Sequence, residues 1–105
     1  MDTMLKTLGE PKRCEIIRLV WSEEKAATDI AAHFPSVTRS AISQHLGVLR
    51  RSGLVSERRD GTRRLYSVNH GEVARLRAFL DSFWTDSLEK LRDLAEASEQ
   101  MKGQQ

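Results

Sequence analysis

The sequence predicts a mainly α-helical fold with one β-hairpin, a winged helix-turn-helix in the order α-α-α-α-β-β-α. Three features indicate it: a strongly capped helix that starts at residue 38, two β-prone runs around Asp60-Gly61, and a long apolar stripe of helical period after Val73. The chain has 105 residues and no apolar run of about 18 to 20 residues. We therefore expect one domain over residues 1–98, a polar tail over 99–105 and no membrane span.

The first three helices are short. Leu5 and Leu8 indicate the first, and Pro11 suits the first turn of the second. Helical spacing puts four apolar residues on one face of the second helix: Cys14, Ile17, Val20 and Trp21. SEEK (22–25) is expected to be a polar connector, and Thr28 is expected to cap the third helix.

The fourth helix is the most strongly specified element. Thr38 is a good N-cap, and Gly53 is free to take the left-handed conformation at its end. Ile42, Leu46 and Leu49 define a buried face. The opposite face carries small or hydrogen-bonding residues and arginine, where glutamate and lysine would be usual: Ser40, Ser43, Gln44, Gly47 and Arg51.

The hairpin and the last helix complete the order. With Asp60 and Gly61 as the two loop residues, Arg59 would face Thr62, Glu57 would face Arg64 and Val55 would face Tyr66. Asn69 is expected to cap a last helix of roughly 25 residues, about twice the mean length. A helix that long outruns so small a core, so a second copy of the chain is expected to cover its far half.

Charge and side-chain chemistry together predict contact with double-stranded DNA. Residues 39–64 hold seven arginines and two acids, a balance of +5 against +2 for the whole chain, whereas residues 81–99 hold six acids and two bases. A helix in the major groove needs small residues near the bases, hydrogen-bonding side chains to read base edges, and arginines for phosphates. The predicted DNA contacts are Thr38, Arg39, Ser40, Ser43, Gln44, His45, Arg51, Arg59, Arg63 and Arg64.

Four motifs in order resemble the ArsR/SmtB-type winged helix-turn-helix repressors: LGEPKRCEIIRLV, TDIAAHF, AISQHLGVLRRSGLV and RRDGTRRLYSV. The ending LRAFLDSFW is similar to the metal-independent, SdpR-like branch. The resemblance implies a bacterial, cytoplasmic and nucleoid-associated homodimer that binds an inverted-repeat operator and represses its own or a neighbouring operon. It also implies dimerisation through the first and last helices, with an interface at Leu5, Leu8, Leu76, Leu80, Phe83, Trp84, Leu88 and Leu91.

Departures from the family pattern limit the regulatory chemistry. Ala26 and Thr28 stand where the family's metal sensors carry Cys-x-Cys, and no histidine follows His70, so neither family metal site is expected. Gly47 replaces a usual lysine or arginine. The sequence contains no nucleophile–base set that would predict an enzyme. We predict no cofactor and assign no inducer, although Phe79, Phe83 and Trp84 fit either a core or a small-molecule pocket.

Several alternatives stay open. The chain could be a winged-helix module for protein–protein interaction, although its exposed face is polar and basic. It could also be a thiol or metal sensor that uses Cys14 and histidines, although the position of Cys14 favours a buried, inert thiol. His45 fits either a phosphate contact or a boundary histidine bonded to backbone.

Overall fold

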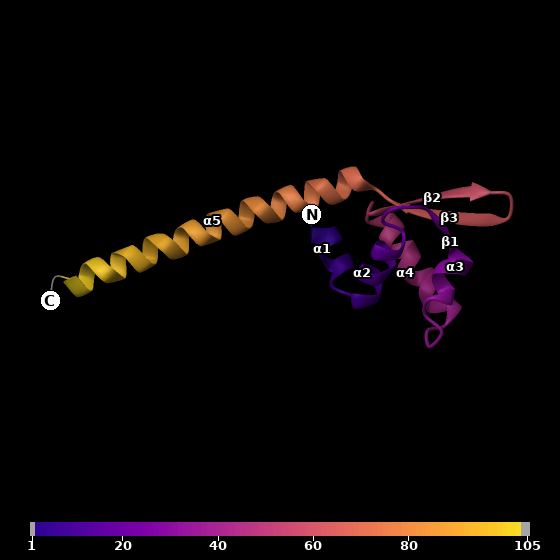
Figure 1. Ribbon diagram of the computed structural model, residues 1–105, viewed down its shortest axis with the longest axis horizontal. Helices are drawn as coiled ribbons and strands as arrows, with labels where there is room; N and C mark the ends of the chain where they lie inside the picture. The colour runs from indigo at the N-terminus through magenta and orange to yellow at the C-terminus, as the bar shows by residue number, and fades with distance from the viewer. Residues whose placement is uncertain (1, 104–105) are drawn as a thin grey trace. The chain divides into compact units, whose positions relative to one another are not determined.

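The computed structural model describes residues 2–103, which divide into two compact units, the first ending at Val73 and the second beginning at Ala74. The first unit begins with α1 (Asp2–Leu8) and α2 (Pro11–Leu19). It continues with β1 (Lys25–Ala26), α3 (Ala27–Ala32), α4 (Arg39–Arg51), β2 (Val55–Asp60) and β3 (Arg63–Val68) (Figure 1). Within it, α3 and α4 pack against the sheet and α2 packs against α4, which is the arrangement of a winged helix-turn-helix. No helix that the structure describes is both long and apolar enough to cross a membrane.

Helix α4 forms as its capping signals predict. The Thr38 hydroxyl accepts a hydrogen bond from the backbone N–H of Ala41 at 3.1 Å. At the other end Gly53 has φ +87°, the left-handed conformation that glycine adopts without strain. The predicted face is buried, since Ile42, Leu46 and Leu49 are each at most 2% exposed. The opposite face of α4 is therefore fixed toward solvent.

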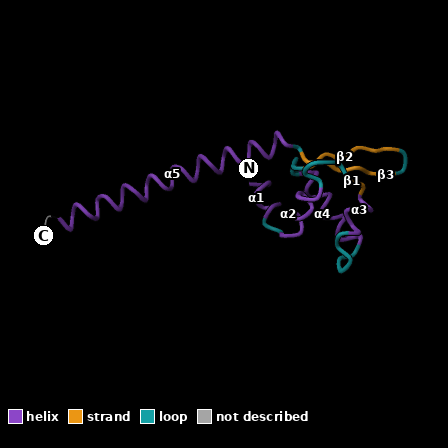
Figure 2. Tube along the Cα trace, viewed as in Figure 1, coloured by secondary structure: helices purple, strands orange, loops and turns teal. Residues whose placement is uncertain are grey.

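The sheet has three strands in the order β1-β3-β2, whereas the sequence predicted only the hairpin (Figure 2). The predicted connector ends in β1, where Lys25 and Ala26 pair antiparallel with Tyr66 and Leu65. A two-residue strand is too short to show an alternating pattern. The prediction for α3 was also wrong at its start, because Ala26 is its N-cap and Thr28 lies inside the helix.

The register of the hairpin differs from the predicted one by two residues. Gly61 and Thr62 form the loop, Asp60 faces Arg63, and Arg59 faces Arg64. Gly61 has φ +64°, and no other loop residue has a positive φ. That pattern suits a type II′ turn with glycine first, not the Asp-Gly turn that the sequence suggested. The predicted pairs are therefore wrong: Glu57 faces Tyr66 and Val55 faces Val68.

The apolar core lies between the helices and the sheet and includes Ile16, Ile30, Leu46, Leu54 and Val55. Two residues of the predicted buried face of α2 do not fit. Trp21 is 44% exposed, because α2 ends at Leu19 and helical spacing no longer applies beyond it. Its ring instead meets His70 edge-on, with centroids 4.8 Å apart. Cys14 is half-buried.

Helix α5 (His70–Gly103) begins directly after Asn69, as predicted, but has 34 residues where about 25 were expected. Residues 99–103 of the predicted tail continue the helix, and residues 104–105 lie outside the described part. The segment from Glu72 to Lys102 contains neither glycine nor proline to end it. Its apolar residues Leu80, Phe83, Trp84, Leu88 and Leu91 are 42–63% exposed, whereas Leu76 is 4% exposed.

Candidate nucleic-acid interface

The solvent face of α4 forms the floor of a shallow hollow. Ser40, Ser43, Gln44 and Arg51 are exposed there, and His45 and Gly47 are half-buried. The hollow is lined by Arg13, Ser40, Ser43, Gln44, His45, Gly47, Val48 and Arg51. These side chains offer hydroxyl, amide, imidazole and guanidinium groups without a carboxylate among them. The surface therefore suits an electronegative, hydrogen-bonding partner.

Gly47 and Arg51 lie one turn apart on this face and fit together. A Cβ added at Gly47 would lie 3.1 Å from Nη1 of Arg51 and 3.8 Å from its Cζ. The guanidinium of Arg51 therefore lies over Gly47, in space that a side chain at residue 47 would fill. The sequence singled out Gly47 as a small residue of the predicted DNA-facing side and as the loss of a cation, and its fit with Arg51 was not visible from spacing.

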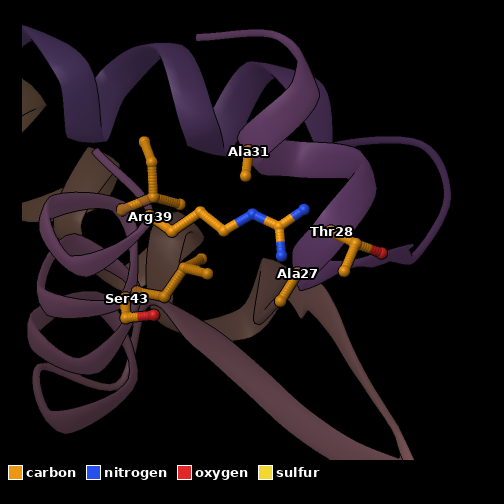
Figure 3. A pocket seen from close by; sticks show the side chains of 7 residues that line it. Ala27, Thr28, Ala31, Arg39 and Ser43 are labelled. Carbon is orange, nitrogen blue, oxygen red and sulfur yellow. The ribbon is translucent and has the colours of Figure 1, made fainter. Parts of the chain in front are cut away.

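Arg39 stands at the first turn of α4 and reaches toward α3. Its side chain extends over a pocket of about 160 Å³, with Ala27, Thr28 and Ala31 around the guanidinium and Ser43 below (Figure 3). The rest of the lining is apolar, from Ile42 and Leu46. The pocket holds the stem of Arg39 at the junction of α3 and α4, so the charge sits at one edge of the α4 surface.

The wing, which is the hairpin of β2 and β3, brings a second group of cations beside α3. Arg63 forms an ion pair with Asp29 of α3 at 3.6 Å, and both side chains are about 60% exposed. Ala26, Ala27, Thr28 and Ser43 line one hollow together with Thr62, Arg63 and Arg64. The wing strand β3, the start of α3 and the face of α4 thus border a common surface.

Glu57 ties the wing to the end of α4. Its carboxylate lies 3.5 Å from Nε of Arg50 and 3.8 Å from Nε of Arg64. The hydroxyl of Tyr66 donates to it at 3.5 Å. Burial raises the pKa of Tyr66 above its ordinary value, and the negative charge of Glu57 is the second-largest cause of the increase. The pairing of Arg64 with Glu57 that the sequence suggested is present, as a diagonal contact in the corrected register.

A further ion pair holds the base of the wing. Arg58 forms two hydrogen bonds to the carboxylate of Glu24, in the loop before β1. These bonds, more than simple charge attraction, hold the pKa of Glu24 below its usual range. Since the folded pKa is depressed, the pair stabilises the fold at neutral pH and this contribution is lost as the pH falls through that pKa. Both groups are solvent-exposed, so the effect is modest.

His45 and Cys14 have side-chain partners that the sequence did not predict. Nδ1 of His45 accepts a hydrogen bond from Nε of Arg13 at 3.2 Å, so its partner is neither backbone nor carboxylate. The Cys14 thiol donates to the backbone oxygen of Leu8 at 3.3 Å. Within residues 2–103, no group of three or more His, Cys, Asp or Glu side chains could hold a metal ion.

Three residues that matter for this surface were missed. Arg13, Glu24 and Asp29 each hold an arginine or histidine of the surface through a contact between segments far apart in the sequence. For Glu24 and Asp29 the only sequence signal was the acidic side chain itself, which does not identify its partner, and Arg13 is one basic residue among many. The predicted residues Ser40, Ser43, Gln44, His45 and Arg51 line one hollow, whereas Arg39 lines the neighbouring pocket together with Ser43.

The chain matches known proteins along most of its length. Residues 10–57 match the family model described as "Bacterial regulatory protein, arsR family". The transcriptional repressor SdpR of Bacillus subtilis is 33% identical over 69 residues, which are 66% of this chain and 76% of SdpR.

Solved structures agree with the fold. A crystal structure described as "Possible transcriptional regulator for arsenical resistance" is 46% identical and has a TM-score of 0.73, over 87% of this chain and 93% of that one. The solution structure of Mb0332 from Mycobacterium bovis, described as a homodimeric winged helix-turn-helix DNA-binding domain, is 32% identical with a TM-score of 0.64. The match covers 77% of this chain and 74% of that one.

Proposed function

We propose that this chain, which belongs to the ArsR family of bacterial regulatory proteins, represses transcription by binding as a homodimer to an inverted-repeat operator in its own or a neighbouring operon. The observation that carries the proposal is the solvent face of α4. Serine, glutamine and glycine occupy its middle and arginines its edges, directly opposite the buried Ile42, Leu46 and Leu49. A DNA-binding regulator of this family is not an enzyme.

Base reading would fall to the side chains in the middle of α4. The amide of Gln44 has the donor and acceptor that fit the N6 and N7 edge of adenine, and Ser40 and Ser43 are short enough to let the helix enter the groove. Thr38 and His45 would contact the sugar–phosphate backbone of the DNA beside these bases. Arg39 and Arg51, at the edges of the face, would hold phosphates and so set the helix's position on the duplex.

The wing would contact the phosphate backbone of the DNA outside the major groove. Arg59 and Arg64 face each other across the strands, where like charges repel, and within the described residues Glu57 forms an ion pair with Arg64 but not with Arg59. Arg63 would exchange its exposed partner Asp29 for a phosphate at little cost, because exposed ion pairs contribute about 0–1 kcal/mol. The wing is therefore arranged to receive a polyanion.

Self-association would use the apolar stripe of α5. Phe83, Trp84, Leu91 and Leu94 recur at helical spacing and are each 62–68% exposed. An aromatic and leucine surface of that kind is rarely left in water by a soluble protein. The two residues of α1 that were predicted to lie in the interface differ from each other: Leu5 is 38% exposed, whereas Leu8 is packed against the core. A second copy of α5 is the partner we propose for the stripe.

The test is a binding titration on duplex DNA at several salt concentrations. DNA selected from random sequence, and DNA from upstream of the gene, would be compared with a scrambled duplex. If Arg39, Arg51, Arg59 and Arg63 each neutralise one phosphate, a dimer contacts eight, and log K against log salt should fall with a slope near −7, at about 0.9 for each phosphate. A footprint should show two half-sites about 34–36 Å apart. A slope shallower than about −2, or no preference over the scrambled duplex, would contradict the proposal.

A further inference from the structure

The side chain of Arg13, in α2, joins α1 to α4. Its Nη1 donates to the backbone oxygen of Thr7 at 3.2 Å, and its Nε donates to Nδ1 of His45 at 3.2 Å. Thr7 is itself fixed, because it is 2% exposed and its hydroxyl donates to the backbone oxygen of Thr3 at 2.8 Å. The guanidinium is therefore held at one end by a buried helix terminus and at the other by the imidazole.

This geometry determines where the proton of His45 lies. A guanidinium has only donors and keeps its charge in proteins, so Nδ1 of His45 must be the acceptor and carries no hydrogen. The neutral ring then has its proton on Nε2. His45 is half-buried and lines the same hollow as Ser40, Gln44 and Arg51. The remaining N–H of the ring is the donor it can offer to a ligand in that hollow.

We propose that Arg13 is a positioning residue for DNA binding, which holds His45 in the tautomer whose Nε2–H donates to a phosphate oxygen beside α4. The inference rests on the proposed function and deepens it. Arg13 acts through His45 and does not itself touch the duplex. Because the ring is oriented before DNA arrives, less conformational entropy is lost on binding.

The salt dependence separates this role from a direct contact. A neutral N–H that binds a phosphate releases no counterion, so losing it weakens binding without changing the slope of log K against log salt. If Arg13 itself neutralised a phosphate in each protomer, its removal would flatten the slope by about 2 for the dimer. A purely structural role would lower the melting temperature and would add to the effect of a change at His45.

The experiment is a double-mutant cycle on the selected operator, with Arg13→Met, His45→Ala and the double variant titrated over a salt series. Arg18→Met is the matched control, since it removes the same charge from an exposed position of the same helix. We expect each single variant to bind about tenfold more weakly, the size of one or two hydrogen bonds, and the double variant to bind no more weakly than either. The slope should match that of Arg18→Met. Additive losses, a slope flattened by about 2, or affinity equal to that of the control would overturn the proposal.

Two further measurements keep the result decisive. If Arg13→Met fails to fold, Arg13→Lys keeps the charge but replaces the rigid fork of Nε and Nη1 with a single nitrogen on a flexible stem, and the same weakening is expected. Imidazole ¹⁵N spectra of the unmodified protein should show His45 protonated on Nε2 alone, and a proton on Nδ1 would refute the link. If the protein binds no DNA, the proposed function fails, whereas these spectra still report on the Arg13–His45 contact.

Discussion

Replacing Gly47 with alanine should raise the stability of the protein and lower its affinity for DNA. Glycine within a helix is about 0.8–1.0 kcal/mol less favourable than alanine, and Gly47 lies in the middle of the 13-residue α4. The new methyl group would lie 3.1 Å from Nη1 of Arg51. That contact needs a shift of a few tenths of an ångström at the far end of a flexible side chain, which costs little.

The net gain in unfolding free energy should therefore be about 0.5–1 kcal/mol, which raises the melting temperature by about 2–8 °C for a domain of this size. The same methyl group would stand on the proposed DNA-reading face and would displace the Arg51 guanidinium from its place over Gly47. One weakened phosphate contact in each protomer should reduce operator affinity by about tenfold, since a charge-assisted hydrogen bond contributes roughly 1.5–3 kcal/mol when complete.

Thermal unfolding by circular dichroism, at one fixed protein concentration, and anisotropy titration of a labelled operator measure the two effects. Gly71→Ala is the control, because a Cβ there meets nothing within 4 Å and the residue lies in the first turn of α5. It should leave DNA affinity unchanged. A Gly47→Ala protein that melts below the unmodified one, or that binds the operator equally well, would refute the fit of Arg51 over Gly47 and its role in binding.

Three other changes test separate parts of the proposal. Arg63→Ala should weaken binding to all duplexes alike and flatten the salt slope by about 2, whereas Asp29→Asn should strengthen binding and leave the slope the same or steeper; loss on one sequence only would contradict a phosphate role for Arg63. Gln44→Ala should lower discrimination at one base position by about 1–3 kcal/mol, measured on a set of single-base operator variants, and equal losses on every variant would argue against base reading. Phe83→Asp with Leu91→Asp should give monomers in sedimentation velocity and weak DNA binding, while Ala78→Asp with Thr85→Asp, on the other side of α5, should stay dimeric; a dimeric stripe variant would show that the interface lies elsewhere.

Local signals predicted the elements that are determined locally. The caps at Thr38 and Gly53 and the spacing of Ile42, Leu46 and Leu49 are all found as expected, because each depends on residues within a few turns. The length of α5 was underestimated, because residues 99–105 were predicted to be a polar tail although neither glycine nor proline precedes Gly103 there. Composition alone does not separate a polar tail from a polar helix.

The pairing of strands far apart in the sequence could not be predicted from the sequence. β1 exists only because β3 lies beside it, and the hairpin register was chosen from a common dipeptide although Gly61 begins the loop. A shift of two residues keeps every side chain on its face, so the apolar pattern fits both registers equally. The cross-strand neighbours nevertheless changed, and with them the electrostatic environment of Arg59 and Arg64.

The same limit applies to the charge of the candidate interface. A count over residues 39–64 treats all seven arginines alike, but Arg50, Arg58, Arg63 and Arg64 have carboxylate partners in the folded chain, and two of those partners, Glu24 and Asp29, lie outside the counted segment. Three cations of that segment, Arg39, Arg51 and Arg59, have no such ion pair in the part of the chain that the structure describes. Three phosphates in each protomer would give a slope near −5, and a fourth, reached when Arg63 leaves Asp29, would bring it near −7. The slope thus reports whether the wing exchanges its internal partner for DNA, which no count of arginines along the sequence can express.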